Sequence, residues 1–282
     1  MYQCWIENEY GEKLELTNNP NYIVYQIDGL QPPNAIINTT KIASMDGTRF
    51  NSASANERNV VIYLTIEGDC ETNRINLYKY VKTRKYVKFY YKNSSRDVYI
   101  DGYVESMQIA MFEIKQKMQI SILCPQPYFK SINNSFIEFA SVSAAFVFPF
   151  AYTAEGGPFS VMERGAMQTV SNAGEIENGI IINMKATGQA LNPQVYNIST
   201  NEYFKLSVEL AEGDEIIINT NKTQKSVILI HDGTRSNIIN NMDIGSKWFQ
   251  LLPGDNIFSA DADEFPENIF CSITHVDEFE GV

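Results

Sequence analysis

In the middle of the chain, hydrophobic and polar side chains alternate over residues 117–124. A period of two residues predicts a β-strand with one buried face. Pro125 follows at once, and because proline has no N–H to donate to a sheet, the strand should end there. We therefore predict two domains that meet at this point, residues 1–130 and residues 131–282. The apolar positions of the strand are Met118, Ile120, Ile122 and Cys124.

Shorter stretches of the same alternation fill the first half of the chain, with turn residues between them. Residues 2–6 and 13–17 are predicted to form a hairpin. Asp101-Gly102 marks either a β-bulge or a close approach of two backbones. The other strands predicted in this half cover residues 22–27, 60–67, 86–91, 97–105 and 108–113.

One helix is predicted over residues 71–82, because Asp69 or Thr72 can cap its first turn. Basic and aromatic residues then mix over residues 79–92, which is also typical of nucleic-acid binding. We interpret these aromatic residues as core positions and the cations as a solvated face. The side chains expected to share the buried face of the helix are Ile75, Leu77, Tyr78 and Val81.

Residues 35–59 show little hydrophobic periodicity around a central Asp46-Gly47 turn signal. This pattern predicts an extended hairpin arm that buries little against its own domain. We expect such an arm to reach a neighbouring subunit through its apolar side chains. The predicted anchors are Ile36, Ile37, Met45 and Phe50.

The second half is predicted to be a β-sandwich, because short strands follow one another with turn signals between them. The clearest strand covers residues 203–210, and residues 277–280 are expected to fray. The other predicted strands cover residues 181–188, 215–220, 226–230, 248–252 and 269–273. The predicted fold class is therefore mainly β, with one helix and a long hairpin arm in the first domain.

The composition is that of a folded protein, with 44% hydrophobic and 20% charged residues among 282. No apolar run approaches the roughly 20 residues of a membrane-spanning helix. The first residues also lack the pattern of a signal peptide. We therefore expect synthesis in a cytosol and no membrane insertion.

Charge is shared unevenly between the two halves. Residues 1–130 contain 15 Lys and Arg against 14 Asp and Glu, whereas residues 131–282 contain 7 against 20. The resulting net charges, +1 and −13, support two units with different surroundings. The acidic half would repel phosphates, which argues against nucleic-acid binding.

Residues able to carry catalysis are scarce. The chain has only two histidines, His231 and His275, and no Gly-x-Ser-x-Gly motif. We interpret both histidines as structural, predict no enzymatic activity and expect no cofactor. The four cysteines are too far apart for a zinc site and are interpreted as buried free thiols. They are Cys4, Cys70, Cys124 and Cys271.

Two carboxylate pairs, Asp214/Glu215 and Asp261/Asp263, are expected to lie in turns, where solvation explains them. Calcium binds oxygen-rich loops, and Asp261, Asp263 and Glu264 form the best candidate. Because no complete ligand loop is present, we predict no metal site.

Several short motifs follow one another along almost the whole chain. They are Asn8-Glu9-Tyr10-Gly11, Asp28-Gly29-Leu30-Gln31-Pro32-Pro33, Asp101-Gly102-Tyr103-Val104-Glu105, Cys124-Pro125-Gln126-Pro127-Tyr128-Phe129, Gly213-Asp214-Glu215-Ile216 and Lys247-Trp248-Phe249-Gln250. In this order, the motifs resemble the distal tail protein family of siphophages that infect Gram-positive bacteria. Gln31 departs from the family pattern, which usually has a small residue there, and this affects only the geometry of that turn.

The resemblance implies a hexameric ring at the tip of a phage tail. The N-terminal domains would form the ring with the help of the arm, and the C-terminal domains would be galectin-like β-sandwiches. The implied partners are other copies of the chain, the tail-tube protein, the tail-associated lysin or hub protein, and receptor-binding proteins. The implied location is the tail tip of the virion, after synthesis in the host bacterial cytoplasm.

A host cell-wall carbohydrate-binding module is the alternative from a different class. Trp248 is the candidate for stacking against a sugar ring, although its place in an alternating segment favours core packing. A wall hydrolase is a third hypothesis. It would require activity on peptidoglycan that depends on acidic residues.

Overall fold

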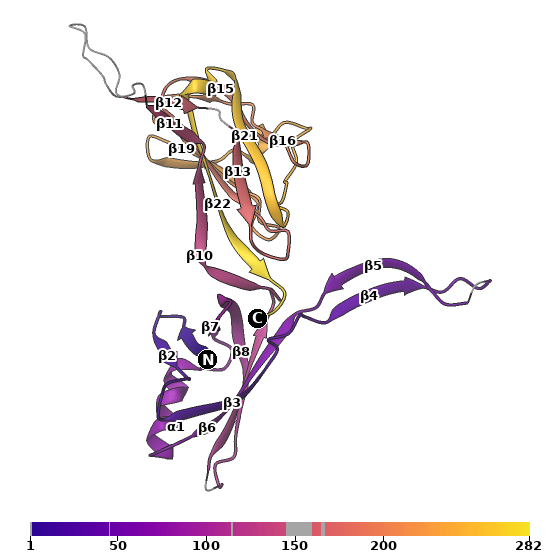
Figure 1. Cartoon of the computed structure of the whole chain (residues 1–282), viewed down its shortest axis with the longest axis vertical. Coiled ribbons are helices and arrows are strands. Elements are labelled where there is room, and N and C mark those ends of the chain that lie inside the picture. Colours follow the sequence, from indigo (N-terminus) through magenta and orange to yellow (C-terminus); the bar gives the residue numbers. More distant parts are fainter. Residues whose placement is uncertain (1, 45, 114, 145–159, 165–166) are drawn as a thin grey trace. The chain divides into compact units, whose positions relative to one another are not determined.

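The computed structural model divides into two compact units (Figure 1). Unit 1 contains residues 1–132 together with the C-terminal residues 278–282, and unit 2 contains residues 133–277. The fold is mainly β, as the sequence predicts, with one α-helix in the described part of the chain. The structure describes residues 2–44, 46–113, 115–144, 160–164 and 167–282.

Unit 1 is built on an antiparallel sheet with the strand order β2-β1-β7-β8-β9-β6-β3. Helix α1 (Cys70–Tyr80) packs against β1, β2 and β6. The strands are β1 (Gln3–Asn8), β2 (Lys13–Glu15), β3 (Tyr22–Asp28), β6 (Arg58–Ile66), β7 (Tyr86–Lys92), β8 (Asp97–Ile109) and β9 (Lys117–Cys124).

The core of unit 1 follows from the alternation seen in the sequence. Strand β9 has the predicted bounds, and its four apolar side chains are at most 1% exposed. Ile120 lies directly opposite Ile62 of β6, so the two strands contribute the same face to the core. The buried side chains of β6 recur at every second position: Val60, Ile62, Leu64 and Ile66.

Helix α1 begins as predicted at Asp69, whose carboxylate accepts a hydrogen bond from the Thr72 backbone N–H at 3.3 Å. Leu77 and Val81 are fully buried. The prediction for Ile75 is wrong, because this side chain is 53% exposed. Ile75 precedes Leu77 by only two residues, which places it on a different side of a helix with 3.6 residues per turn.

Two predictions about β8 need correction or refinement. No separate strand covers residues 108–113, because β8 itself continues to Ile109 and a turn follows. At Gly102 an added Cβ would lie 3.0 Å from the Leu123 carbonyl oxygen and 2.6 Å from the Ile122 side chain, so β9 approaches this glycine closely. The bulge is a separate feature further along, where the pairing of β8 with β9 shifts between Val104 and Ser106.

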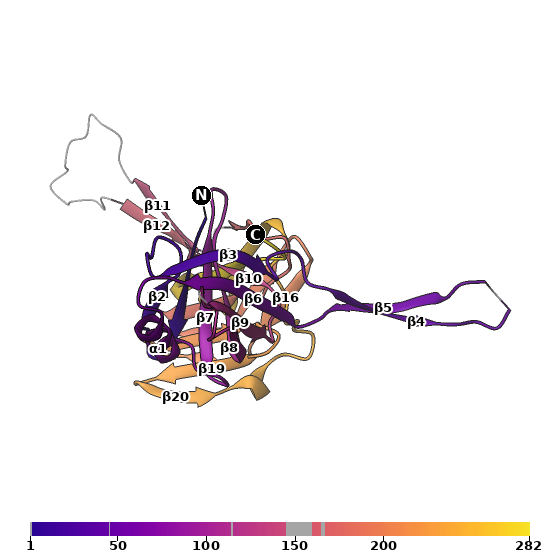
Figure 2. The ribbon, with the colours of Figure 1, turned by 90° about the horizontal axis from the view of Figure 1, so that it is seen from below.

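A long hairpin arm leaves unit 1 between β3 and β6, as predicted from residues 35–59. It consists of β4 (Ala35–Thr40) and β5 (Arg49–Ala55), which pair with each other and with no other described strand. Every described residue of both strands is exposed. Figures 1 and 2 show the arm projecting away from the rest of unit 1.

Unit 2 is a sandwich of two antiparallel sheets around one core. One sheet has the order β13-β21-β15-β16, with β17 also paired to β15, and the other contains β10-β22-β14-β18-β19-β20. The short strands β11 (Ala140–Ala144) and β12 (Ser160–Arg164) pair with each other. Two 3₁₀ helices, η1 (Ile239–Asn241) and η2 (Pro266–Asn268), lie in connections. The remaining strands are β10 (Phe129–Glu138), β13 (Gln168–Asn172), β14 (Ile181–Ala186), β15 (Ala190–Asn197), β16 (Glu202–Lys205), β17 (Glu209–Leu210), β18 (Glu215–Asn219), β19 (Ser226–His231), β20 (Thr234–Asn237), β21 (Gly254–Glu264) and β22 (Ile269–Phe279).

The strand predicted over residues 203–210 is divided into β16 and β17. Its neighbour β15 contains Pro193, which has no N–H to donate, so the ladder is interrupted at this position. The Leu206 N–H still donates to the Pro193 carbonyl at 3.0 Å, whereas the Ser207 N–H turns away from β15 and donates to the Asn241 carbonyl at 2.7 Å. Burial still follows the predicted alternation, because Phe204, Leu206 and Leu210 have no exposed surface.

Three further predictions for this half are wrong. Residues 248–252 alternate in burial but make only one isolated bridge, between Leu251 and Asn178. Asp261 and Asp263 lie on strand β21 rather than in a turn. Residues 277–280 do not fray, because β22 extends to Phe279 and the Val282 backbone N–H donates to Leu30 in unit 1 at 3.1 Å.

Candidate functional site

The arm has two chemically different faces, and a β-bulge creates the difference. Ile37 lies opposite Ala53, and beyond the bulge Phe50 lies opposite Thr39. Opposed residues of an antiparallel pair share a face, so the bulge moves Phe50 onto the face of Ile37. These two side chains are 62% and 61% exposed. We define the apolar arm face as Ala35, Ile37, Phe50, Ala53 and Ala55.

The other face of the arm is mainly polar. Asn38 donates to the Ser52 hydroxyl at 3.0 Å, and Asn51 donates to the Thr40 hydroxyl at 2.6 Å. Ile36, 47% exposed, belongs to this face because it lies opposite Ser54. The structure therefore brings Ile37 and Phe50 together and separates Ile36 from them. The fourth predicted anchor, Met45, lies outside the described residues.

Arg58 holds the root of the arm and is only 3% exposed. Its guanidinium lies 4.6 Å from the centre of the Phe129 ring, and burial lowers the pKa of the group. It donates hydrogen bonds to four backbone carbonyls, those of Gly29, Gln31, Pro127 and Glu280. One side chain thus joins the segment that enters the arm, the segment that follows β9 and the C-terminal residues.

A second arginine fixes the C-terminal residues within unit 1. Arg96 donates to the Gly281 carbonyl, and its guanidinium lies 4.4 Å from the centre of the Phe279 ring. Gly281 also packs closely against Leu30, because an added Cβ would lie 3.1 Å from the Leu30 carbonyl oxygen. The end of the chain is therefore part of the same cluster as the arm root.

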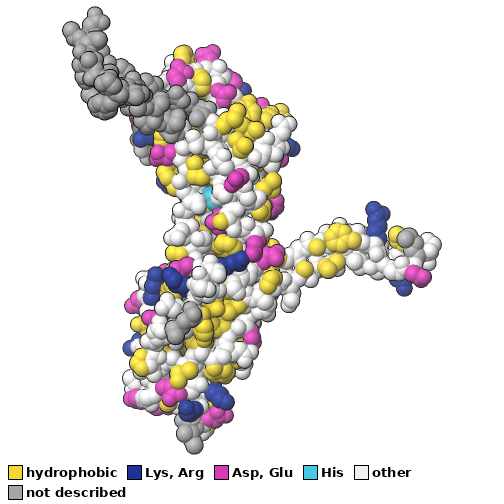
Figure 3. Space-filling model, viewed as in Figure 1, with side chains coloured by type: hydrophobic (Ala, Val, Ile, Leu, Met, Phe, Trp, Pro, Cys, Tyr) yellow, Lys and Arg dark blue, Asp and Glu magenta, His cyan; other side chains and the backbone are white. Residues whose placement is uncertain are grey.

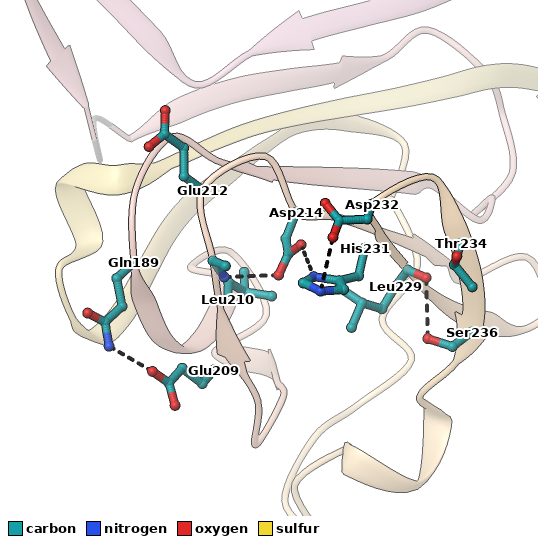
Figure 4. Close-up of a pocket in the computed structure, with 11 residues that line it drawn as sticks. Gln189, Glu209, Leu210, Glu212, Asp214, Leu229, His231, Asp232, Thr234 and Ser236 are labelled. Carbon is teal, nitrogen blue, oxygen red and sulfur yellow. Dashed lines mark hydrogen bonds and ion pairs between the residues drawn. The ribbon is translucent and has the colours of Figure 1, made fainter.

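Unit 2 contains an acidic groove of about 970 Å³ between the β19–β20 hairpin and the segment before β18 (Figure 4). His231 Nδ1 lies 2.6 Å from Asp214 Oδ1, and this hydrogen bond raises the pKa of His231. The other oxygen of Asp214 accepts from the Ala211 N–H at 2.9 Å. Asp214 is thus held by its own loop, and the His231–Asp214 pair ties two segments together. The other carboxylates around the groove are Glu209, Glu212 and Asp232.

No metal site is evident in the part of the chain that the structure describes, where no three His, Cys, Asp or Glu residues cluster suitably. The calcium candidate is engaged elsewhere: Asp263 accepts hydrogen bonds from Lys205 at 2.6 Å and from Asn192 at 2.9 Å. Asp261 accepts from the adjacent Ala262 N–H at 2.8 Å. Among the described residues, no helix is long and apolar enough to cross a membrane.

Most of the cysteines, and the predicted sugar-stacking residue Trp248, pack in or against the hydrophobic cores. All four cysteines are free thiols, but Cys70 is only partly buried. Burial raises the pKa of the Cys4 and Cys124 thiols to about 12. Trp248 packs its ring edge-on against Phe204 with centres 5.0 Å apart. Lys225 Nζ lies 5.6 Å from the centre of the same Trp248 ring.

Comparison with known proteins agrees with this two-unit description. Residues 9–124 match the phage tail protein RIFT-related domain, and residues 173–271 match the C-terminal domain of the siphovirus-type tail component. The fold and these matches define a two-domain phage tail protein. The chain belongs to the siphophage distal tail protein family, and its role is that of a structural component of the tail.

Solved structures share the fold. The Dit protein (gp 19.1) of phage SPP1, described as a paradigm of the hub adsorption apparatus in phages infecting Gram-positive bacteria, is 13% identical with a TM-score of 0.70. The match covers 99% of each chain. A chain of the phage P2 baseplate in its activated conformation with Ca is 10% identical over 100% of both chains, with a TM-score of 0.53. A search among curated proteins finds no match.

Sequence reasoning missed Arg58 and the acidic groove. Arg58 precedes the apolar alternation of β6 by two residues and reads as an ordinary charged residue after the arm. Its importance comes from carbonyl groups of segments up to 222 residues away, for which the sequence contains no local signal. The groove combines β17, the segment before β18, β19 and β20, which also meet only in the folded unit.

Proposed function

We propose that this chain forms a hexameric ring at the tip of a phage tail and acts by protein–protein contact rather than by catalysis. In the ring, the apolar arm face of one subunit packs against unit 1 of the next. The observation that carries the proposal is the arm itself, an antiparallel pair with no buried face and with Ile37 and Phe50 exposed on the same face. Burying such side chains fully is worth about 1.5–3 kcal/mol each.

The surface that receives the arm should be apolar and close to a free strand edge. In the described part of unit 1, β3 pairs only with β6 and forms an edge of the sheet. This strand exposes Ile23 at 52% and Tyr25 at 53%, and the Tyr25 ring lies 6.2 Å from that of Tyr63. We propose that the apolar arm face covers these side chains on the neighbouring copy.

The ring would join the tail-tube protein, the tail-associated lysin or hub protein and the receptor-binding proteins. Two contact regions on one chain support this connecting role. The arm and the edge at β3 serve contacts between identical subunits, and unit 2 retains its own exposed surface for other tail proteins. Such a ring would be located at the tail tip of the virion, after synthesis in the host cytoplasm.

A matched set of variants tests the arm contact. Ile37→Asn combined with Phe50→Asn removes the apolar arm face, and Ile36→Asn makes the same chemical change on the polar face. The double variant should shift the protein from hexamer to monomer in sedimentation velocity, whereas Ile36→Asn should keep most of the hexamer. Equal sedimentation of all three proteins would refute the assignment of the contact face.

A further inference from the structure

Two tyrosines lie side by side on the solvent face of unit 2. Tyr196 of β15 is directly opposite Tyr203 of β16, and their ring centres are 6.1 Å apart. The next pair along the strands, Val195 and Phe204, is fully buried, so the tyrosines point away from the core. Tyr196 is 37% exposed. Figure 3 shows hydrophobic side chains gathered over this part of unit 2.

The Tyr203 ring is held in place by the segment after η1. Its hydroxyl donates to Asp243 Oδ1 at 3.0 Å, and the Gly245 N–H donates to the same oxygen at 2.9 Å. Gly245 also leaves the space that the ring occupies, because an added Cβ would lie 2.0 Å from the Tyr203 hydroxyl. The Tyr203 ring is thus fixed before any ligand arrives, which lowers the entropic cost of binding to it.

The same segment blocks the free edge of β16. The Lys247 N–H donates to the Tyr203 carbonyl at 2.8 Å, and the Asp243 N–H donates to the Lys205 carbonyl at 3.0 Å. The Lys205 N–H in turn donates to the Ser246 hydroxyl at 2.9 Å. An extended peptide therefore cannot add to this sheet as another strand, because the backbone groups that it would pair with are already used. A ligand has to bind on the face of the sheet.

A pocket of about 270 Å³ lies on this face. Its volume is slightly below the range of about 300–1,000 Å³ that is typical for drug-sized ligands, so it fits a small molecule. Polar groups lie beside the aromatic rings, since Asn201, Glu202 and Ser259 line the pocket. Ser259 lies opposite Tyr196 on β21, which extends the row across a third strand. Met167 and Ile198 complete the apolar part of the lining.

We propose that this pocket binds one pyranose ring of a carbohydrate. A pyranose has apolar C–H faces, which pack on aromatic rings, and a rim of hydroxyl groups, which need acceptors and donors. Tyr196 and Tyr203 supply the aromatic surface. The Glu202 carboxylate accepts sugar hydroxyls, and the Asn201 amide and Ser259 hydroxyl both donate and accept. The site is independent of Trp248 and goes beyond the connecting role, because it contacts a sugar rather than a tail protein.

Saturation-transfer difference NMR tests the proposal with free monosaccharides as probes. The probes are glucose, galactose, N-acetylglucosamine and rhamnose, each mixed with the full-length protein. At least one should receive saturation from the wild-type protein, and Tyr196→Ala should weaken its binding about tenfold. Tyr196→Phe keeps the ring and should retain binding.

Tyr10→Ala is the matched control, because Tyr10 is a 71% exposed tyrosine in unit 1. This variant should bind the sugar as the wild type does. Far-ultraviolet circular dichroism and thermal melting establish that each variant is folded. Absence of binding by all four sugars would overturn the proposal. Binding that survives Tyr196→Ala, or that is lost equally in Tyr10→Ala, would also overturn it.

Discussion

Unit 1 contains two antiparallel strand pairs whose side chains have opposite environments. In the pair β6–β9, an apolar side chain is buried at every second position, and these eight side chains are at most 1% exposed: Val60, Ile62, Leu64, Ile66, Met118, Ile120, Ile122 and Cys124. In the pair β4–β5, Ile37 and Phe50 are aligned on one face yet remain more than 60% exposed. Burial of side chains within the chain stabilises the pair β6–β9. The second pair gains no comparable stabilisation from its own subunit.

This difference indicates that β6–β9 serves the folding of unit 1, whereas β4–β5 serves assembly. Isolated two-stranded hairpins are marginally stable in water. The arm nevertheless has a bulge that aligns its two largest apolar side chains, as well as side-chain hydrogen bonds on its other face. A hairpin with an organised apolar face and no partner in its own unit fits a contact between subunits.

The largest expected effect is on stability within the pair β6–β9. Ile120→Ala should lower the free energy of unfolding by about 2–5 kcal/mol, because it leaves a cavity in the core. Phe50→Ala on the arm should change the stability of the dissociated subunit by less than about 0.5 kcal/mol. Urea denaturation at a low protein concentration measures both. Equal losses would show that the arm packs against its own unit.

The arm root should show an intermediate effect. Arg58→Ala removes the donor for four carbonyl groups, and an unsatisfied buried polar group costs about 1–3 kcal/mol. Some of these carbonyls will regain water, so we expect a total loss of about 3 kcal/mol. Arg49→Ala, an exposed arginine on the arm, is the control and should be neutral. A neutral Arg58→Ala variant in urea denaturation would contradict this account of the root.

Acid should weaken unit 2 without affecting the arm contact. Burial lowers the pKa of His275, although the carboxylate of Asp277 opposes this effect. The unfolded chain therefore binds more protons than the folded one just below the unfolded value of about 6.5. Stability should fall as the pH decreases from about 6.5 towards the lower folded pKa. His275→Gln should flatten this dependence in thermal melts recorded at several pH values.

His231 is the control, because its contribution to stability has the opposite pH dependence. Its folded pKa is raised by Asp214, so its contribution is complete below the unfolded pKa and is lost as the pH rises through the folded value. The described residues of β4 and β5 contain no histidine, so the oligomer should not dissociate in the same pH window. Dissociation near pH 6 would indicate that groups outside the arm carry the contact.

Much of this structure follows from local pattern in the sequence. The period-two alternation gave β9 with its bounds, and the Asp46-Gly47 signal gave the arm. The pattern could not show that a bulge places Phe50 on the same face of the arm as Ile37 and leaves Ile36 on the other face. Register depends on the pairing of two strands, which a local pattern does not contain. The Tyr196–Tyr203 pair likewise depends on the register of β15 and β16. The roles of Arg58 and of the C-terminal residues of unit 1 depend on long-range contacts, for which the sequence contains no local signal.

The most direct test of the ring compares the wild-type chain with an arm deletion by light scattering after gel filtration. The Asn56 N–H donates to the Asn34 carbonyl at 2.8 Å, so a two-glycine turn can replace residues 35–55 without disturbing the rest of unit 1. The wild type should have a mass of about 192 kDa, that of six copies of the 32.0 kDa chain, and the deletion variant should be a folded monomer. A monomeric wild type, or a deletion variant that still forms hexamers, would contradict the account.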